Sequence, residues 1–236
     1  MKRILGPLRR GVEKYEMIKP GDRIAVGLSG GKDSTALLVA LKRFQYFSPV
    51  PFELEGITLD MGFGGMDLSP LVDLCAKLEV HYTIKKTSIG PIVFEERQEK
   101  NPCSLCARMK RGALHDLAIE RGCRTIALGH HADDAIETFF LSLFYEGRIN
   151  TFSPVTYLDR KDITMIRPLI FVKERDIIGD PEMKKLPVIQ STCPANGYTK
   201  REDIKNMIKN LRKTIPNLDD RVLGAIQNKE QLNLWF

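Results

Sequence analysis

Short apolar runs alternate with longer stretches of helical periodicity along most of the chain. The apolar runs, which are typical of buried strands, are residues 23–28, 52–59, 80–86 and 125–129. The helical stretches are residues 34–47, 69–78, 107–121 and 132–145. Because strands and helices alternate in this way, we expect an α/β fold with a parallel twisted sheet and helices on both faces.

The pattern becomes less regular towards the C-terminus. Residues 165–171 (MIRPLIF) are expected to form a late strand or an edge segment, because Pro168 cannot donate a hydrogen bond within a central strand. Residues 179–198 contain prolines and show no clear period. Apolar residues return at helical spacing in residues 201–214, and a short helix is expected at 219–232. These segments predict a small C-terminal helical extension.

Composition and charge narrow the class of protein. A chain of 236 residues with 43% hydrophobic residues is not disordered, and no apolar run approaches the ~20 residues that span a bilayer. The N-terminus has no signal-peptide pattern, so we expect a cytoplasmic protein that does not enter a membrane. The net charge of +6 is divided into +4 for residues 1–19, −2 for residues 20–180 and +4 for residues 181–236. Basic ends suit a polyanion such as nucleic acid, and ordinary solvated helix faces are the alternative.

One glycine-rich tract lies between the first predicted strand and the helix that follows it. We call it the glycine loop, and it consists of Ser29, Gly30, Gly31, Lys32, Asp33 and Ser34. Adjacent glycines let backbone N–H groups approach phosphate oxygens, and the helix N-terminus, the lysine and the two hydroxyls add to the attraction. The spacing excludes a Walker A loop and a G-x-G-x-x-G dinucleotide loop. The alternative is an ordinary strand-to-helix turn that carries a lysine by chance.

A second polar block, GHHADDAIET at residues 129–138, follows the fourth predicted strand and begins a helix. Open α/β sheets bind ligands at this edge. Asp133 and Asp134 could therefore hold Mg²⁺ beside phosphates, or could serve only as helix caps. Arg167 could stabilise charge at a phosphate, and a structural salt bridge is the alternative.

Five cysteines, an odd number, in a chain of this length do not indicate a disulfide framework, so a metal, cluster or redox role is considered first. Cys103 and Cys106 form a C-x-x-C motif, which occurs in redox pairs, in zinc sites and in iron–sulfur ligand sets. Cys75 and Cys123 lie in apolar contexts and are expected to be buried, inert thiols. Cys193 differs, because it lies in the irregular segment just before the basic helix.

The glycine loop SGGKDS resembles that of the PP-loop ATP pyrophosphatases, and GHHxDDxxET with Arg167-Pro168-Leu169 resembles motifs of their tRNA-modifying members. The likeness extends over nearly the whole chain, including LRRGVEKYEMIKPGDRIAVGLSGGKDS, PCSLCARMKRGAL, GHHADDAIETFFLSLFYEGRI and IRPLIFVKERDI. The chain is similar to the TtcA family, the tRNA 2-thiocytidine synthetases. It departs from the better-known members after Cys193, where CPAN replaces a second C-x-x-C.

This resemblance implies the substrates, cofactors and partners of the protein. It implies ATP, Mg²⁺ and a [4Fe–4S] cluster, together with tRNA and a sulfur donor such as a cysteine desulfurase, and a homodimer is one option for the assembly. The implied catalytic residues are Lys32, Asp133, Asp134, Arg167, Cys103, Cys106 and Cys193. The implied nucleotide-binding residues are the six of the glycine loop with Leu59, Gly129 and His130. The cysteines among them are the implied cluster ligands, and Asp133 and Asp134 the implied Mg²⁺ ligands.

The resulting hypothesis is an ATP-dependent tRNA sulfurtransferase that adenylates a base carbonyl, with cytidine C2 in the anticodon-loop region as the expected position, and exchanges oxygen for sulfur. The alternatives are a lysidine synthetase-like ligase without a cluster and a nucleotide- or RNA-binding module with structural zinc. We expect a basic N-terminal helical segment (1–19), a PP-loop catalytic domain (20–178) and a C-terminal helical extension (179–236) that carries the third cluster cysteine.

Overall fold

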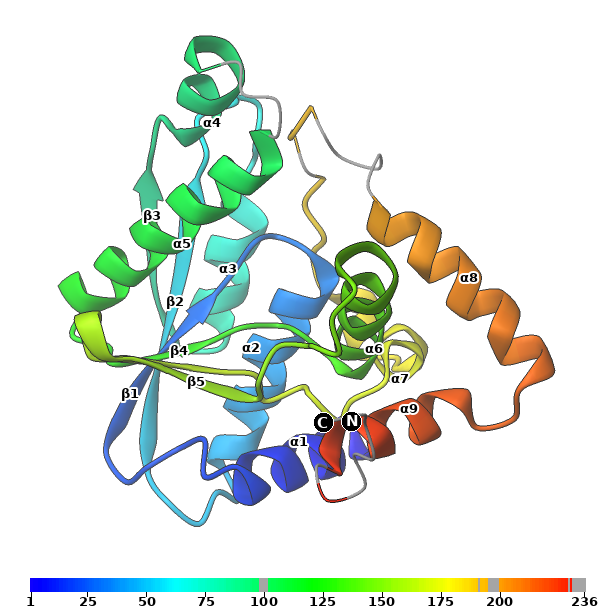
Figure 1. Ribbon diagram of the computed structural model, residues 1–236. Helices are drawn as coiled ribbons and strands as arrows, with labels where there is room; N and C mark the ends of the chain where they lie inside the picture. The colour runs from blue at the N-terminus through cyan, green and yellow to red at the C-terminus, as the bar shows by residue number, and fades with distance from the viewer. Residues whose placement is uncertain (98–101, 191, 195–199, 229, 231–236) are drawn as a thin grey trace.

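The chain folds around a six-stranded sheet (Figure 1). A computed structural model describes residues 1–97, 102–190, 192–194, 200–228 and 230. The sheet has the order β3-β2-β1-β4-β6-β5, and all neighbouring strands are parallel except β5, which is antiparallel to β6. The strands are β1 (Asp22–Gly27), β2 (Phe52–Asp60), β3 (His81–Lys86), β4 (Thr125–Ala127), β5 (Val155–Leu158) and β6 (Ile163–Ile166).

Helices connect the strands and extend the chain at both ends. The α-helices are α1 (Lys2–Lys14), α2 (Lys32–Gln45), α3 (Ser69–Lys77), α4 (Ile89–Pro91), α5 (Pro102–Glu120), α6 (Ala132–Leu141), α7 (Glu174–Gly179), α8 (Lys200–Thr214) and α9 (Leu218–Gln227). Two π-helical turns, η1 (Ile92–Glu96) and η2 (Ser142–Glu146), and two 3₁₀ turns, η3 (Asp159–Lys161) and η4 (Met183–Lys185), complete the described elements.

The two faces of the sheet bury different helices because successive side chains of a strand point to opposite sides. On β1, Ile24 and Val26 belong to a large core cluster that includes residues of α1, α2 and α3. Ala25, between them, belongs to a second cluster with Leu117 and Ala118 of α5. The expected parallel sheet with helices on both faces is therefore confirmed.

The late part of the sheet differs from the sequence-based expectation. The predicted late strand or edge segment at 165–171 is wrong, because the strand β6 begins earlier and ends at Ile166, before Pro168. β6 lies inside the sheet, between β4 and β5. The edge strand on this side of the sheet is β5, which the sequence pattern did not predict, because it has only four residues and forms a hairpin with β6.

The other predicted elements agree in type and differ at their ends. The fourth strand ends at Ala127 instead of 129, so the following polar block begins in a loop. Helix α5 begins at Pro102 instead of residue 107, which places the C-x-x-C motif in its first turns. Helix α9 agrees with the start of the predicted helix at 219–232, whose residues 229, 231 and 232 lie outside the described chain. Residues 191 and 195–198 of the irregular segment also lie outside it.

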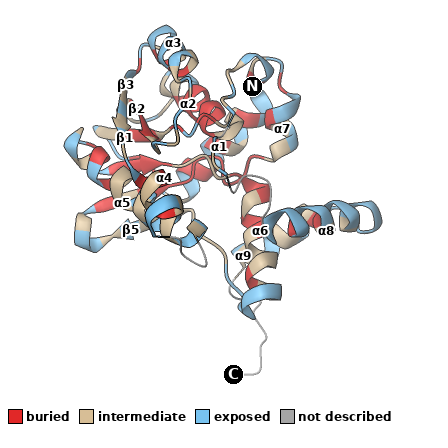
Figure 2. Cartoon of the chain, turned by 90° about the horizontal axis from the view of Figure 1, so that it is seen from above, coloured by how far each residue is buried: buried red, intermediate tan, exposed pale blue. Residues whose placement is uncertain are grey.

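Both terminal segments pack on the central unit. Ile4 and Leu8 of α1 are fully buried in the same core cluster as α2. Ile204 and Ile208 of α8 pack with Ile136 of α6, while the rest of α8 projects with largely exposed faces (Figure 2). The division of the chain into three domains stays a prediction. Over the described residues, no helix has the length and apolar character needed to cross a membrane.

A buried carboxylate ties the central strands to α5. Glu55 on β2 has no exposed surface and accepts hydrogen bonds from Arg121 Nε (2.7 Å), Arg23 Nη2 (2.8 Å) and Thr83 Oγ1 (2.9 Å). Burial alone would raise the pKa of Glu55, but the hydrogen bonds from these three residues outweigh it and leave the pKa below its usual value. The charged form is therefore the one that stabilises the fold.

We expect Glu55→Gln to lower the free energy of unfolding at pH 7 by about 3 kcal/mol, because two guanidinium groups lose a buried carboxylate partner. A carboxylate with a lowered pKa contributes fully above its unfolded value and loses its contribution as the pH falls through the folded value. The difference between the variant and the wild type should therefore shrink below pH ~4. Urea unfolding at pH 7 and at successively lower pH measures it, and a constant difference would contradict this account.

Candidate active site

The glycine loop lies at the carboxyl edge of the sheet, where strand order reverses. The chain leaves β1 toward β2 and β3 on one side, and returns to β4 on the other side of β1. Ligands of open α/β sheets bind at such a switch point. Gly30 has φ +84°, a conformation that L side chains rarely adopt, and Gly31 precedes α2 as its N-cap residue.

The hydroxyls of the glycine loop stabilise its turn. Ser34 Oγ donates to Gly31 O (2.9 Å) and accepts from the Ser29 backbone N–H (3.2 Å). Within the described residues, no side chain caps the N-terminus of α2, so its first N–H groups remain available to an anion. The arrangement fits the predicted phosphate cradle.

The loop between β4 and α6 lies directly against the glycine loop. A Cβ atom added to Gly129 would stand 2.9 Å from the Ser34 backbone nitrogen and 3.0 Å from Asp33 O. Real Cβ atoms do not approach backbone atoms so closely, so only glycine fits here. The structure thus brings the predicted residues Gly129 and His130 beside the glycine loop.

Lys32 is held between two carboxylates. Its Nζ lies 2.9 Å from Asp33 Oδ2 and 2.8 Å from Glu174 Oε1. Burial would lower the pKa of Lys32, but the hydrogen bonds to Glu174 and Asp33 raise it above its usual value, so the ammonium stays charged at neutral pH. Glu174, the first residue of α7, was not predicted from the sequence, where it is one acidic residue among many.

The two predicted Mg²⁺ ligands contact protein groups. Asp134 Oδ2 accepts from the His131 backbone N–H (2.9 Å), and His131 Nδ1 accepts from the Asp134 backbone N–H, which forms a capping box. The capping interpretation is thus confirmed for Asp134. Asp133 Oδ2 accepts from the Glu174 backbone N–H (2.7 Å), and Arg212 of α8 hydrogen-bonds its other oxygen. Mg²⁺ binding by either residue stays a prediction.

Helix α8 supplies cations to the carboxylates on α6 and at the start of α7, and we call this group of carboxylates the acidic edge. Arg201 Nη1 lies 3.3 Å from Asp134 Oδ1 and 3.4 Å from Glu137 Oε2. Lys205 Nζ lies 3.3 Å from Glu174 Oε1. These ion pairs were not predicted from the sequence, which indicates only that the region around α8 is basic.

Arg167 follows β6 at the same edge and is 6% exposed. Its Nη1 donates to Ser153 O (2.6 Å) and Thr156 Oγ1 (3.2 Å), and its guanidinium lies 5.0 Å from the ring centroid of Phe152. Among the described residues it forms no ion pair, and its buried Nε has no hydrogen-bond partner. The structural salt bridge is therefore not found in this part of the chain, and the buried cation remains available for an anionic ligand.

His130 also packs on the ring of Phe152, which Arg167 contacts. Its imidazole lies 5.0 Å from Phe152, and its Nδ1 is buried without a partner among the described residues. Burial lowers the pKa of His130 to about 4, despite the opposing effect of Asp134. The imidazole is therefore neutral at pH 7, so it adds hydrogen-bonding capacity to the site without adding charge.

Two thiols, those of Cys103 and Cys193, lie within electrostatic range of a third, that of Cys106. The pKa of the Cys106 thiol is raised by burial and, after that, by Cys193 and Cys103, while Lys110 lowers it. Cys103 is exposed, and Cys106 and Cys193 are partly buried. No group of three metal-ligating side chains at binding distance is found in the described part of the chain. The cluster ligation therefore stays a prediction, and the structure shows only that Cys103 and Cys193 are within electrostatic range of Cys106.

The two remaining cysteines have the predicted character. Cys75 and Cys123 are 1% and 0% exposed, and burial raises the pKa of each thiol to about 11. Thiols of this kind stay protonated and inert at neutral pH. Their interpretation as buried structural residues is confirmed.

One segment connects the glycine loop to the third thiol. The Ile189 backbone N–H donates to Gly30 O (2.9 Å), and a Cβ atom added to Gly30 would stand 2.9 Å from Ile189 Cβ. Cys193 follows four residues later. Ile189 was not predicted from the sequence, because nothing in the irregular segment indicates which backbone it contacts.

Leu59, a predicted nucleotide-binding residue, packs in the protein core. It lies near the carboxyl end of β2, is 6% exposed, and its side chain packs in the core cluster with Ile126 and Leu117 on the α5 face. Its contact with a nucleotide stays a prediction.

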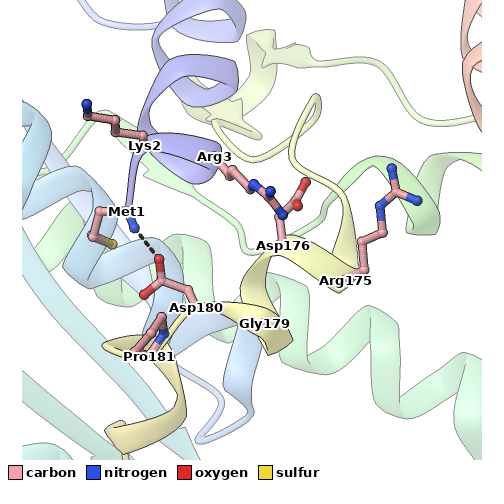
Figure 3. Close-up of a pocket in the computed structure, with 8 residues that line it drawn as sticks. All are labelled: Met1, Lys2, Arg3, Arg175, Asp176, Gly179, Asp180 and Pro181. Carbon is pink, nitrogen blue, oxygen red and sulfur yellow. Dashed lines mark hydrogen bonds and ion pairs between the residues drawn. The ribbon is translucent and has the colours of Figure 1, made fainter.

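A pocket of about 430 Å³ lies elsewhere, between the start of α1 and the end of α7 (Figure 3). The N-terminal ammonium of Met1 is directed at the carboxylate of Asp180, whereas the side chains of Lys2 and Arg175 point away from it. The pocket contains none of the predicted site residues, and its cations do not converge on one point. The candidate active site is therefore the edge that carries the glycine loop.

Comparison with known proteins agrees with this assignment. The family model described as PP-loop domain matches residues 7–210. The tRNA-cytidine(32) 2-sulfurtransferase of Pelobacter propionicus is 36% identical over 96% of this chain and 86% of its own length. The enzyme of that name from Geobacter sulfurreducens is 36% identical over 96% of this chain and 90% of its own length. The one from Neisseria gonorrhoeae is 38% identical over 96% of this chain and 72% of its own length.

Solved structures share the fold. The U34-tRNA thiolase NcsA from Methanococcus maripaludis, solved with its [4Fe–4S] cluster, superposes with a TM-score of 0.77 at 24% identity, covering 98% of this chain and 80% of that one. The NH3-dependent NAD synthetase from Campylobacter jejuni gives 0.52 at 18% identity, covering 96% and 93%. These likenesses establish the fold alone, whereas the sequence matches are close enough to establish the family. This chain belongs to the PP-loop family and, within it, to the TtcA family of tRNA-cytidine(32) 2-sulfurtransferases.

Proposed function

We propose that this protein is an ATP-dependent tRNA sulfurtransferase that replaces the C2 carbonyl oxygen of a cytidine by sulfur. The observation that carries the proposal is that a phosphate-binding loop and the segment leading to a cysteine of the predicted cluster are in contact at the carboxyl edge of the sheet. The phosphate-binding glycine loop, with Lys32, contacts the segment that leads to Cys193, and Cys193 lies within electrostatic range of Cys106 in the C-x-x-C motif. The relatives at 36–38% identity carry the name of this activity.

In this proposal the glycine loop binds the phosphates of ATP. The N–H groups at the start of α2 and the ammonium of Lys32 attract the pyrophosphate end, and the buried guanidinium of Arg167 faces the charge that develops at the α-phosphate. Asp133 and Asp134 would share Mg²⁺ with the phosphates. Both carboxylates would then exchange an arginine partner, Arg212 or Arg201, for the metal ion.

The carbonyl oxygen of the cytidine attacks the α-phosphorus, and the bond to the β-phosphate oxygen breaks to release pyrophosphate. Adenylation turns the carbonyl oxygen into part of a good leaving group. Sulfide then adds at C2, and AMP departs with the former carbonyl oxygen. Neutral His130 and the guanidinium of Arg167 both pack on Phe152 at this edge, so they would offer hydrogen-bonding groups and one positive charge to the bound substrates.

Cys103, Cys106 and Cys193 would hold the [4Fe–4S] cluster. Three cysteines without a disulfide among them, from two segments that come within electrostatic range at Cys106, fit the donor set of a cluster with three protein ligands. Such a cluster, when bound, would supply the sulfide for the exchange. The single cysteine at 193 supplies the third ligand even without a second C-x-x-C.

The remaining partners follow from this chemistry. The sulfide must come from a donor such as a cysteine desulfurase, the tRNA substrate places the enzyme in the cytoplasm, and a homodimer is compatible with the chain. A lysidine synthetase-like ligase would keep the ATP chemistry and need no cluster. A binding module with structural zinc would form neither AMP nor pyrophosphate.

The proposed function is tested by measuring its product, 2-thiocytidine in tRNA. Deleting the gene is expected to remove 2-thiocytidine from cellular tRNA, because no other step in the proposal inserts that sulfur. Mass spectrometry of nucleosides from digested tRNA measures it, and re-expression of the wild-type chain should restore the nucleoside. Unchanged thiocytidine in the deletion strain would overturn the cytidine assignment.

Replacement of the loop lysine tests the ATP chemistry. Lys32→Ala should lower the rate of AMP and pyrophosphate formation with tRNA by about a hundredfold or more, because a fixed cation at the phosphates is lost. Lys42→Ala is the matched control, since it removes a lysine from the last turn of the same helix, α2. Equal rates for Lys32→Ala and the wild type would contradict the assignment.

Metal and sulfide analysis separates the cluster from the alternatives. After anaerobic purification we expect iron and sulfide with visible absorption in the wild type, and loss of both in Cys103→Ala, Cys106→Ala and Cys193→Ala. Cys75→Ala and Cys123→Ala should retain them, because those thiols are buried away from the site. A colourless wild type that forms AMP with an amine donor would favour the ligase, and zinc in place of iron would favour the binding module.

A further inference from the structure

The π-helical turn η2 and the residues after it expose an unusual amount of apolar surface. Phe144, Tyr145 and Ile149 are 57%, 46% and 54% exposed, and we call these three residues the η2 surface. A single exposed apolar residue needs no explanation, but three within six residues form a patch that indicates a partner. Irregular π-helical turns also occur frequently at functional sites.

The rings of this surface are held in place. Phe144 is stacked on Phe140 of α6, with ring centroids 5.7 Å apart and an interplanar angle of 14°. Phe140 in turn packs on the core cluster between α6 and α8. The ring of Phe144 is thus supported on one face and exposed elsewhere, which lowers the entropy lost when a flat group binds to it.

Cations border the rings. Lys200, the first residue of α8, places Nζ 4.6 Å from the centroid of Tyr145, and Arg148 beside the rings is exposed. The acidic neighbour Glu146 accepts a hydrogen bond from Ser142 Oγ (2.9 Å) within the same turn. Exposed rings next to lysine and arginine match the two recurring parts of an unpaired nucleotide, a base with a flat π-face and an anionic phosphate.

The η2 surface adjoins the candidate active site. Arg201 follows Lys200 directly, and it contacts Asp134 Oδ1 (3.3 Å) and Thr138 Oγ1 (3.1 Å) at the start of α6. Helix α8 therefore contacts the acidic edge through Arg201 and the ring of Tyr145 through Lys200. A nucleic acid whose target base enters the site would carry its neighbouring nucleotides across this surface.

We propose that the η2 surface binds unpaired nucleotides that flank the target base in a single-stranded RNA loop, by stacking bases on Phe144 and Tyr145. This inference rests on the proposed function for the identity of the RNA. The cations beside the rings favour RNA over a second copy of the chain, because the contact of two such surfaces would bring like charges together.

The test compares two RNA probes on the full chain. One is a hairpin with the sequence of a tRNA anticodon arm, and the other is a fully paired RNA of the same length and charge. Phe144→Ala is expected to weaken hairpin binding by about tenfold and leave binding of the paired RNA unchanged, because only unpaired bases can stack on the ring. Phe144→Tyr keeps a ring and should bind both probes as the wild type does.

Tyr46→Ala is the matched control. Tyr46 is 78% exposed and follows the last residue of α2, a helix of 14 residues, so about 20 Å of helix separates it from the glycine loop. Its replacement should change neither affinity. Analytical ultracentrifugation of each variant measures the assembly, and near-UV circular dichroism of Phe144→Ala checks that the fold is retained.

Equal hairpin binding by Phe144→Ala and the wild type would overturn the inference. So would a wild type that binds the hairpin no better than the paired RNA, or a change of mass in Phe144→Ala, which would assign the surface to a second copy. Thiolation by the wild type is measured separately. Hairpin preference that depends on Phe144 in a protein that produces no thiocytidine would contradict the proposed function and leave this inference standing.

Discussion

The backbone of the β4–α6 loop lies so close to the start of α2 that a methyl group at Gly129 would collide with the Ser34 nitrogen and the Asp33 carbonyl. This close approach is possible because β1 and β4 are neighbours, and the chain leaves them in opposite directions. The glycine loop and the residues of the polar block thereby share one surface. Every later feature of the site, from Lys32 to Arg167, depends on this approach of two loops that are about a hundred residues apart in sequence.

Electrostatic balance is the second constraint on this edge. Four carboxylates gather around the starts of α6 and α7, from Asp133, Asp134, Glu137 and Glu174, and each is paired with a lysine or an arginine. Three of those cations, Arg201, Lys205 and Arg212, come from α8, so this helix supplies most of the opposing charge. Buried or half-buried carboxylates need such partners to remain charged. A bound cation or polyanion would therefore change the forces that hold α8 in place.

How much of the fold and of the candidate site could be predicted depends on how far apart in the sequence the interacting residues lie. The strand-to-helix turn SGGKDS and the C-x-x-C motif are local patterns, and periodicity places the turn at the sheet edge, whereas it does not show that α5 begins early enough to include the motif. The hairpin of β5 and β6 was missed because its strands are too short to show alternation. Glu174 and Ile189 were missed because their roles arise from contacts with residues more than 140 positions away, which no local pattern reports.

The irregular segment before α8 shows why such contacts matter. A segment without secondary structure has little to fix its path, yet here its backbone is anchored on Gly30 O and its Ile189 side chain fills the space that glycine leaves open. The third thiol follows four residues later, a distance of at most ~14 Å of extended chain. One backbone hydrogen bond and one side-chain contact thus hold Ile189 against the glycine loop, which fixes how far from that loop the third thiol can lie.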